Sequence, residues 1–331
     1  MQSFADEIFQ QPGALDDLMT YYSGQDLSAA RAAYDQPGVL LVGMGASNHA
    51  ARIAAYRQQQ KQPTMRVVEA ADTLLYNPGI LSACSLLVYI SQSGASGEIE
   101  PLFRQLPEQV RTVGITNTTD SLLGAKAGTV LPLCAGEEYT VATKTYLNTL
   151  ALLHLLGGGG MEALGEIREQ VEALLREAAA IQARWIEALA TAKTLYFLGH
   201  GPHAVTARHC AMMAGEWAKR PVFHGSIGAF RHGYIEAVER RTGVVIFAPP
   251  GASARSAQVL ADELAWYGAD VLMVENGRTR KNNEPAQGGS LNEYLSPMLD
   301  VIPGQLFAEA LARHDGIPAG FRYISKVVKK L

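Results

Sequence analysis

Short apolar runs recur along the chain from Gly38 onward, and helix-length stretches separate them. The runs lack the strict alternation of polar and apolar residues that marks a strand with one face in water. Such strands are typical of parallel sheets covered by helices on both faces. We therefore predict strands at residues 39–42, 65–68, 86–90 and 112–115, and again at 194–198, 243–247 and 270–274. Their alternation with helices predicts an α/β fold in which parallel sheets are flanked by helices.

Two further segments differ from this pattern. Residues 147–156 form the longest apolar tract, which contains Asn148 and His154 and ends at four glycines. The tract is too short to span a bilayer, so it predicts a core helix and no membrane partner. Residues 161–192 have a helical period with charged positions on one side, which predicts a connecting helix.

The second half of the chain repeats motifs of the first. Gly43-Met44-Gly45 matches Gly199-His200-Gly201 at an offset of 199 − 43 = 156, and the next glycine turn matches at 251 − 94 = 157. Two matches at nearly one offset predict duplicated domains, although any two strand–turn–helix units share a glycine turn. We predict a helical lead-in at 1–30, a first domain at 31–160, the connecting helix at 161–192, and a second domain with a C-terminal tail at 193–331.

Composition and charge narrow the classes of function. A length of 331 residues suits two domains, and 48% hydrophobic residues suit a globular core. The net charge of −4 provides no basic surface for nucleic acid. Three widely spaced cysteines, which we expect to be buried, predict neither disulfides nor a metal site. The N-terminus lacks the basic and apolar regions of a signal peptide, so we expect a cytoplasmic location.

The segment Ser91-Gln92-Ser93-Gly94-Ala95-Ser96 follows a predicted strand and precedes a plausible helix start at Gly97. Backbone N–H groups at a helix start point outward, and hydroxyls beside them complete an anion site at the end of a strand. Serine and glycine are also ordinary helix-capping residues, so the loop alone does not decide between the two roles.

The second half has Ala248-Pro249-Pro250-Gly251 at the corresponding turn, which removes hydroxyls and two backbone donors. This loss favours one phosphate site per chain, in the first domain. Ser47, at the end of a neighbouring predicted strand, can reach the same crevice.

A dinucleotide site is a weaker alternative. Gly43-Met44-Gly45 ends a strand, and the acidic Glu69 ends the next one. Asn48, however, stands where the dinucleotide fingerprint requires its third glycine. We therefore expect no organic cofactor.

Several motifs together resemble the double-SIS (sugar isomerase) domain family, which includes the isomerase half of glucosamine-6-phosphate synthase and the fructosamine-6-phosphate deglycases. The resemblance covers nearly the whole chain and implies two flavodoxin-like SIS domains. It rests on Gly43 to Ser47, Ser91 to Ser96, Val141-Ala142-Thr143-Lys144, Gly199-His200-Gly201, Glu216, Phe230-Arg231-His232-Gly233 and Phe321-Arg322-Tyr323-Ile324-Ser325-Lys326.

The resemblance implies a role for individual residues. Glu216 matches the carboxylate that moves a proton between sugar carbons 1 and 2, and His232 matches the histidine that helps to open the sugar ring. Lys326 matches a lysine near the sugar carbonyl in an active-site tail. The implied substrate-binding residues are Ser47, Ser91, Gln92, Ser93 and Ser96 at the phosphate, Val141 at the sugar, and Arg322 in the tail.

These residue types suit aldose–ketose conversion, which needs ring opening and then proton transfer through an enediol. Each also has an ordinary alternative. These alternatives are a solvent-facing helix carboxylate for Glu216, a hydrogen-bonded loop histidine for His232, and a solvated lysine cluster for Lys326.

Departures from the synthase leave the reaction open. Met213 and His209 stand where the synthase has a lysine and a glutamate. We expect an isomerase of a hexose or hexosamine 6-phosphate, with a fructosamine-6-phosphate deglycase or an amino sugar phosphate deaminase as alternatives. A non-catalytic sugar-phosphate sensor is the alternative from another class. The resemblance further implies a homodimer with shared active sites, in which His232 serves the partner's site.

Overall fold

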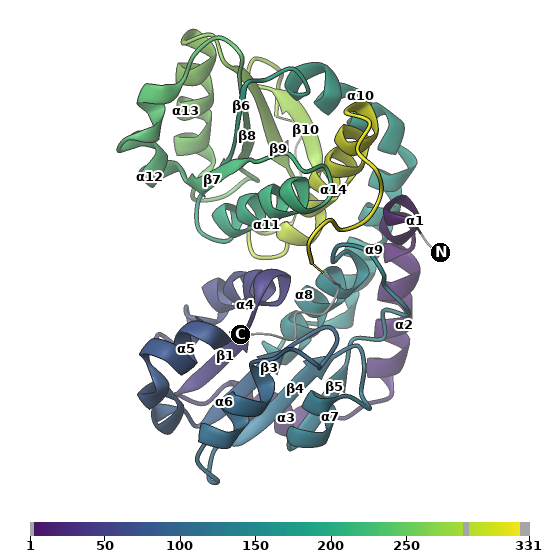
Figure 1. Cartoon of the computed structure of the whole chain (residues 1–331), viewed down its shortest axis with the longest axis vertical. Helices are drawn as coiled ribbons and strands as arrows, with labels where there is room; N and C mark the ends of the chain where they lie inside the picture. Colours follow the sequence, from purple (N-terminus) through teal and green to yellow (C-terminus); the bar gives the residue numbers. More distant parts are fainter. Residues whose placement is uncertain (1–2, 287–290, 325–331) are drawn as a thin grey trace. The chain divides into compact units, whose positions relative to one another are not determined.

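The computed structural model describes residues 3–286 and 291–324, which divide into two compact units. We call residues 10–168, with 322–324, the N-terminal unit, and residues 3–9 with 169–321 the C-terminal unit. Each unit contains a five-stranded, mainly parallel sheet flanked by helices (Figure 1). The predicted α/β fold class is confirmed.

The sheet of the N-terminal unit has the strand order β2-β1-β3-β4-β5, and all neighbouring strands are parallel. In a sheet with this order the connections leave β1 and β3 in opposite directions, so the topological switch point lies between these two strands. The strands are β1 (Val39–Gly43), β2 (Arg66–Glu69), β3 (Leu86–Ile90), β4 (Arg111–Thr116) and β5 (Thr129–Pro132).

Helices cover both faces of this sheet. On one face, side chains such as Val42 and Tyr89 pack against α5 (Ala70–Tyr76), the 3-10 helix η1 (Pro78–Ala83), α6 (Ile99–Gln105) and α7 (Leu122–Lys126). On the other, α4 (Gly45–Gln58) packs against α8 (Lys144–Leu156), and α8 also contacts α2 (Gln11–Ser23) and α3 (Ser28–Tyr34). Every residue of α8 is buried, which confirms the predicted core helix.

The sheet of the C-terminal unit has the order β7-β6-β8-β9-β10, which matches the first sheet strand by strand. Its last strand differs, because β10 pairs antiparallel with β9. Asn276 and Gly277 form the tight turn between these two strands, both with positive φ angles. The strands are β6 (Thr194–Gly199), β7 (Phe223–Ser226), β8 (Thr242–Phe247), β9 (Asp270–Glu275) and β10 (Arg278–Lys281).

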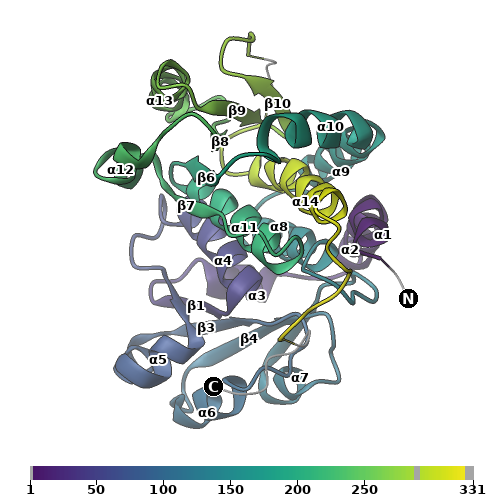
Figure 2. The same cartoon turned by 45° about the horizontal axis from the view of Figure 1, so that its top comes forward.

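Helices again cover both faces. Tyr196 and Ile246 pack toward α12 (Ile227–Arg231), the 3-10 helix η2 (Tyr234–Ala237) and α13 (Ala254–Trp266). On the opposite face, the ring of Phe197 contacts Trp185 of α10 (Ala178–Leu189) and Phe307 of α14 (Pro297–His314). Helix α11 (Pro202–Glu216) lies beside α14 on this face (Figure 2). The short N-terminal α1 (Phe4–Phe9) joins the unit through Phe4, whose ring centroid lies 4.8 Å from that of Trp217.

All seven predicted strands are present, with ends that differ by at most one residue. The short strands β5, β7 and β10 at the sheet edges were not predicted. Two of them have the sequences FHGS and RTRK, which carry no apolar run to detect. The prediction of wholly parallel sheets is wrong for β10.

Within the predicted connecting helix the structure has two helices, α9 (Met161–Arg176) and α10. The predicted domain limits at residues 30, 160 and 192 stay a prediction. All three cysteines are free, but only Cys210 is buried as expected, because Cys84 and Cys134 are half-buried.

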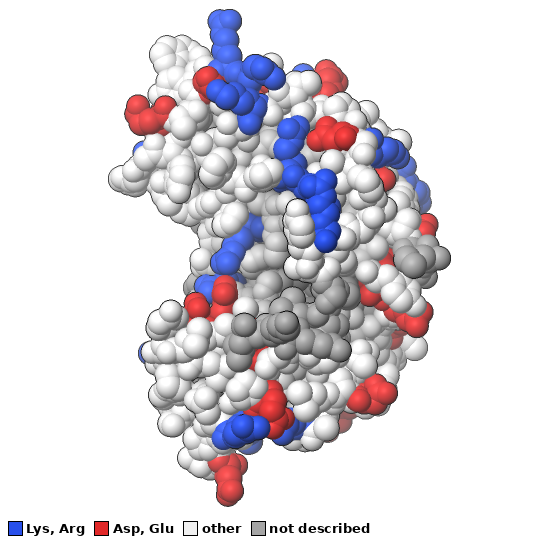
Figure 3. All heavy atoms as spheres, viewed as in Figure 1, with Lys and Arg blue, Asp and Glu red and all other residues white. Residues whose placement is uncertain are grey.

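No helix in the described ranges is both long and apolar enough to cross a membrane. Residues 3–286 and 291–324 likewise contain no group of three or more His, Cys, Asp or Glu side chains placed to hold a metal ion. Figure 3 shows basic and acidic side chains in small, interspersed groups, without a continuous basic stripe on the face in view.

His154, a buried residue of α8, contacts the glycine segment 157–160 that follows this helix. The Arg57 guanidinium donates to Nδ1 of His154, and Nε2 of the same ring lies 3.3 Å from the carbonyl oxygen of Gly160. A β-carbon at Gly159 would lie 2.1 Å from His154 Nε2, so only glycine fits there. Burial and the Arg57 charge lower the pKa of His154 to about 4.

This histidine predicts a loss of stability in mild acid. The pKa is about 6.5 in an unfolded chain, so the unfolded state takes up the proton first as the pH falls. Stabilisation by neutral His154 is complete above pH 6.5 and is lost as the pH falls toward 4. We expect about 2 kcal/mol of this loss between pH 7 and pH 5. In urea unfolding, the difference in free energy of unfolding between pH 7 and pH 5 should be smaller in His154→Gln than in the parent. The control variant His314→Gln, at an exposed histidine, should show the parental difference.

Candidate functional site

The predicted phosphate-binding residues of the N-terminal unit flank its topological switch point. Ser47 is the third residue of α4, which begins directly after β1, and the segment from Ser91 to Ser96 follows β3. Because β1 and β3 are parallel neighbours, both turns lie at the carboxyl edge of the sheet. Ser91 is buried, and Ser47, Gln92, Ser93 and Ser96 are half-buried. The structure therefore brings these predicted residues to one edge of the unit.

The loop after β3 is held by the last residue of β4 and by the segment that follows this strand. The carbonyl oxygen of Gln92 accepts from the backbone N–H of Asn117 at 3.0 Å and from Thr116 Oγ1 at 3.2 Å. The carbonyl of Gly94 accepts from the N–H of Leu123 at 2.9 Å. In a planar trans peptide the C=O and the next N–H point in opposite directions. These bonds therefore turn the N–H groups of Ser93 and Ala95 away from β4.

Several backbone N–H groups of the loop after β3 make no hydrogen bond within the described residues. The backbone N–H groups of Ser93, Ser96 and Gly97 make no hydrogen bond to any described residue, whereas that of Ala95 donates to Ser93 Oγ at 3.2 Å. Helix α6 begins at Ile99, two residues later than the predicted start at Gly97. The free donors thus belong to an extended loop and not to the first turn of the helix, which corrects the predicted helix start.

Gly94 is required by its conformation and its surroundings. Its φ angle is +59°, and a β-carbon there would lie 1.9 Å from Ser121 Oγ. Ser121 cannot yield easily, because its hydroxyl caps α7 by accepting from the N–H of Gly124. Thr116 and Ser121 therefore fix the loop from outside its own sequence.

Tyr89 lies beneath the loop on the buried strand β3. Its hydroxyl is 3.4 Å from Ser96 Oγ. Burial raises the pKa of Tyr89 well above its usual value, so the phenol keeps its proton and can donate to Ser96. A serine oxygen that accepts in this way keeps its own proton for a ligand.

Asn48 explains the missing glycine of the dinucleotide fingerprint. Its amide donates to the carbonyl oxygens of Gly43 at 3.3 Å and Val68 at 2.9 Å, and its oxygen accepts from Arg52 Nε at 2.7 Å. The buried side chain therefore joins the ends of β1 and β2, where the fingerprint would place a bare glycine.

Val141 lies buried in the long loop between β5 and α8. Glu138 organises this loop, because its carboxylate accepts from the N–H groups of Thr143 and Thr145 and from both hydroxyls, at 2.6 to 3.2 Å. A carboxylate at the start of α8 also interacts favourably with the helix dipole. Sequence analysis missed Glu138, although a glutamate five residues before a Thr-Lys-Thr helix start was a visible signal.

Glu216 is the last residue of α11 and is half-buried beside the buried Met213 and Trp217. The helix joins the parallel neighbours β6 and β7, so it runs back across the sheet and ends near the amino-terminal ends of the strands. Arg220 in the next turn confirms this, because it donates to the carbonyl of Ala190, shortly before β6. His209, which stands at the synthase's glutamate position, is buried in the same helix.

His232 ends α12 and is exposed. Its side chain makes no hydrogen bond or ion pair with any residue in the described ranges, while its neighbour Arg231 pairs with Glu263 at 2.6 Å. Arg322 is also exposed, and Lys326 lies outside the described residues.

The corresponding turns of the C-terminal unit differ chemically from the serine loop. His200 Nε2 and Ser256 Oγ are 3.1 Å apart, and burial lowers the pKa of His200. Pro249 and Pro250 offer no N–H group, and that of Ala248 donates to Val274. This turn therefore lacks the N–H groups that correspond to those of Gln92 and Ser93 in the first sheet.

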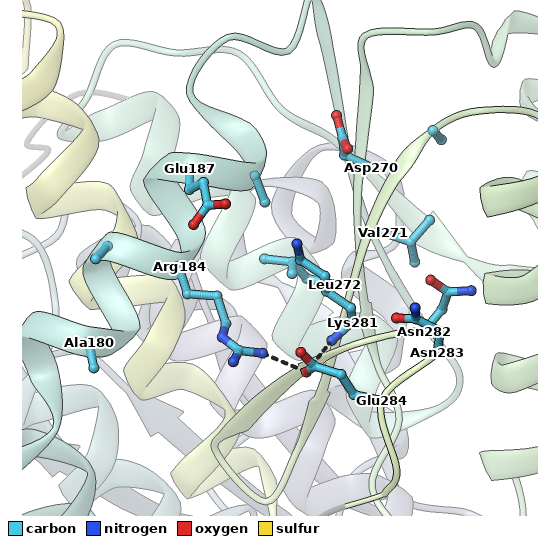
Figure 4. A pocket seen from close by; sticks show the side chains of 13 residues that line it. Ala180, Arg184, Glu187, Asp270, Val271, Leu272, Lys281, Asn282, Asn283 and Glu284 are labelled. Carbon is cyan, nitrogen blue, oxygen red and sulfur yellow. Dashed lines mark hydrogen bonds and ion pairs between the residues drawn. The ribbon is translucent and has the colours of Figure 1, made fainter.

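A groove of about 650 Å³ lies in the C-terminal unit, between α10 and the start of β9 (Figure 4). Arg184 and Glu284 form an ion pair in it at 2.6 Å. The groove contains none of the predicted site residues. It also lies at the amino-terminal end of β9, whereas parallel sheets bind their ligands at the carboxyl edge.

Comparison with known proteins agrees with this geometry. The sequence profile of the SIS domain matches residues 34–157 and 188–281. Glutamine–fructose-6-phosphate aminotransferase (isomerizing) of Streptococcus pneumoniae strain R6 is 26% identical over 333 residues, covering 94% of this chain and 55% of the relative. The chain therefore spans about half the length of the curated relatives it matches.

Solved structures share the fold along the whole chain. The C-terminal domain of glucosamine-fructose-6-phosphate aminotransferase from Francisella tularensis superposes with a TM-score of 0.83 at 21% identity, covering 97% of this chain and 99% of that one. Glucosamine-6-phosphate deaminase from Thermotoga maritima gives 0.77 at 22% identity, with 98% and 99% covered.

The surroundings of Gly94 predict a sharp effect of one methyl group. Gly94→Ala adds the cost of a left-handed alanine and an overlap with Ser121, so we expect the free energy of unfolding to fall by about 3 kcal/mol. Gly136→Ala is the matched control, because Gly136 has a φ of +63° but open space around it. It should lose only about 1 kcal/mol in the same urea titration. Equal losses in the two variants would show that the overlap is relieved at no cost.

Proposed function

Because this chain belongs to the SIS domain family, we propose that it is a cytoplasmic enzyme that interconverts aldose and ketose forms of a hexose or hexosamine 6-phosphate. The observation that carries the proposal is the set of free donors in the loop after β3. The N–H groups of Ser93, Ser96 and Gly97 have no partner among the described residues, and serine hydroxyls accompany them. Several such donors at the carboxyl edge of a parallel sheet are well suited to bind a phosphate group.

In the proposed binding mode, the phosphate accepts hydrogen bonds from Ser47, Ser91, Ser93, Ser96 and the loop amides, with Gln92 beside them. Val141 contacts the sugar, and Arg322 adds a positive charge from the tail. No organic cofactor or metal ion takes part. The serine loop anchors the phosphate, whatever sugar carries it.

The proposed reaction has two stages. His232 assists ring opening by giving a proton to the ring oxygen, while the anomeric hydroxyl loses one and becomes the carbonyl. The Glu216 carboxylate then removes a proton from carbon 2 of the aldose, which forms the enediolate. It returns this proton to carbon 1 while the proton of the carbon-2 hydroxyl passes to the carbon-1 oxygen, which gives the ketose. Lys326 stabilises the negative charge that develops on the carbonyl oxygen.

The exposed position of His232 supports a shared site. Its side chain has no partner in the described part of its own chain, so it is available to a second subunit. We propose a homodimer in which His232 serves the partner's active site.

Two further reactions use the same enediol chemistry. A fructosamine-6-phosphate deglycase or an amino sugar phosphate deaminase would need the same phosphate anchor and the same proton transfer. The fold similarity to a glucosamine-6-phosphate deaminase keeps the second of these as an alternative. A sugar-phosphate sensor is the non-catalytic alternative, which predicts binding without turnover.

Proton exchange tests the proposed chemistry directly. Purified protein is incubated in heavy water with hexose, hexosamine and fructosamine 6-phosphates, and deuterium at carbons 1 and 2 is followed by NMR. We expect exchange with at least one of them. Glu216→Gln should slow that exchange by at least about 100-fold, because it removes the base.

Glu187→Gln is the control, since Glu187 is an exposed helix carboxylate of the same unit. It should leave the exchange rate unchanged. Exchange in Glu216→Gln at the parental rate would exclude this residue as the base. Binding without exchange or turnover would favour the sensor.

The serine loop predicts a difference between equivalent serines of the two units. Ser96→Ala removes a donor to a charged group, so we expect the affinity for the hexose 6-phosphate to fall about tenfold. Ser253, at 96 + 157 in the second unit, is its matched control, and Ser253→Ala should change the affinity by less than about twofold. Isothermal titration calorimetry measures the affinity of each variant. A larger loss in Ser253→Ala than in Ser96→Ala would show that the phosphate binds in the C-terminal unit, against the proposal.

A further inference from the structure

The turn after α11 contains a lysine in an unusual backbone conformation. Lys219 has a φ of +56°, in the left-handed region that favours glycine and penalises residues with a β-carbon. The turn itself is closed by a hydrogen bond from the N–H of Arg220 to the carbonyl of Ala214, at 3.2 Å. Glycine would make this turn at lower cost, so the lysine side chain must provide something that glycine lacks.

The side chain of Lys219 joins two segments of the C-terminal unit. Its half-buried ammonium donates to the carbonyl oxygen of Glu216, at the end of α11, and to that of Gly320, at 2.8 Å. Gly320 lies in the segment that follows α14, just before Phe321 and Arg322. We call the chain from Asp315 onward, after α14, the C-terminal tail. A single cation thus connects the end of the helix that carries Glu216 with the start of this tail.

The neighbouring residue strengthens the same connection. Arg220 lies 3.8 Å from Asp315, the first residue after α14, and donates to Ala190 at 2.6 Å. The chain then turns at Gly316, where φ is +64°, and the N–H of Ile317 donates back to Ala312. The tail is therefore attached to the turn after α11 at two points, Asp315 and Gly320. Lys219 makes the second, which is the one nearer to Arg322.

We propose that Lys219 is a positioning residue, which holds the start of the C-terminal tail beside the Glu216 end of α11. The proposal rests on the proposed function, in which Glu216 moves the proton and the tail supplies Arg322 and Lys326. In this role Lys219 acts through two backbone carbonyls, those of Glu216 and Gly320.

The kinetic consequence follows from this division of roles. Most of the proposed phosphate contacts come from the serine loop and only one charge, that of Arg322, comes from the tail, so loss of the anchor should leave KM within about threefold of the parent. The chemical step depends on the relative placement of Glu216 and the tail, and a misplacement of about 1 Å costs up to about 100-fold in rate. Lys219→Met, which keeps an unbranched side chain but removes the ammonium, should therefore lower kcat by at least about tenfold.

Three variants separate positioning from stability. Lys219→Arg retains N–H donors and should recover kcat to within about threefold of the parent. Lys219→Gly fits the left-handed backbone without strain, so its unfolding temperature should be no lower than that of Lys219→Met, yet kcat should fall equally. Lys193→Met is the matched control, because Lys193 forms an exposed ion pair with Glu239 in the same unit. It should leave kcat and KM unchanged.

A second measurement tests the anchor without any substrate. Arg322 is exposed and is a trypsin site just beyond Gly320. In brief native digestion followed by mass spectrometry, cleavage after Arg322 should be severalfold faster in Lys219→Met and Lys219→Gly than in the parent. It should be unchanged in Lys219→Arg and Lys193→Met.

The kinetic and the cleavage measurements test the proposed function and the anchoring role of Lys219 separately. If the parent protein converts none of the sugar phosphates, the proposed function fails, while the cleavage rates still decide whether Lys219 anchors the tail. Parental kcat and cleavage in Lys219→Met would overturn the positioning role. The positioning role would also be overturned if Lys219→Arg did not restore kcat and if the loss of kcat followed the fall in unfolding temperature in all three variants.

Discussion

The hydrogen bonds of the Gln92 carbonyl are the constraint on which the candidate phosphate site depends. A loop of serines and glycine can adopt many conformations, and its N–H groups would point in many directions. Two donors, Thr116 at the end of β4 and Asn117 directly after it, fix this carbonyl on one side, so the following N–H must point to the other. The sheet supplies both strands in the correct order, with β3 and β4 as parallel neighbours. The direction of the loop's N–H groups is therefore a property of the sheet edge and not of the loop alone.

The two units share a strand order but not the chemistry at the carboxyl edge. Where the N-terminal unit has the half-buried Ser47, the C-terminal unit has His203 at 47 + 156, which is buried. Its ring lies 3.6 Å from a buried carboxylate of Asp300, which also accepts from the N–H of Gly277 at 2.7 Å. A buried carboxylate of the protein itself thus lies beside the first turn of α11. The two sheets therefore share a strand order, whereas the second turn has prolines at 249 and 250 where the first has Gln92 and Ser93.

The sequence was sufficient for the strands and for the position of the serine loop, because buried strands and their following turns are local patterns. It was insufficient for the residues that hold the loop. Ser121 and Thr116 act on Gly94 and Gln92 across a sheet neighbour, and no local pattern links them. The edge strand β10 was missed for a related reason, since Arg280 in it is buried by pairing with Glu275 and not by apolar neighbours. Lys326 and the dimer stay predictions, and the pairing of Lys219 with Gly320 required the fold.

The position of Glu216 at the end of a helix has a physical cost that Lys219 offsets. The last carbonyls of α11 lack helical partners and carry partial negative charge, so a carboxylate beside them is disfavoured. The Lys219 ammonium donates to the carbonyl of Glu216 itself and therefore neutralises part of that charge. The same cation holds Gly320. A carboxylate that has to exchange protons needs an environment that tolerates both its charged and its neutral form. A cation fixed to the backbone at the end of α11, and shared with Gly320, offsets part of the negative charge at this helix end.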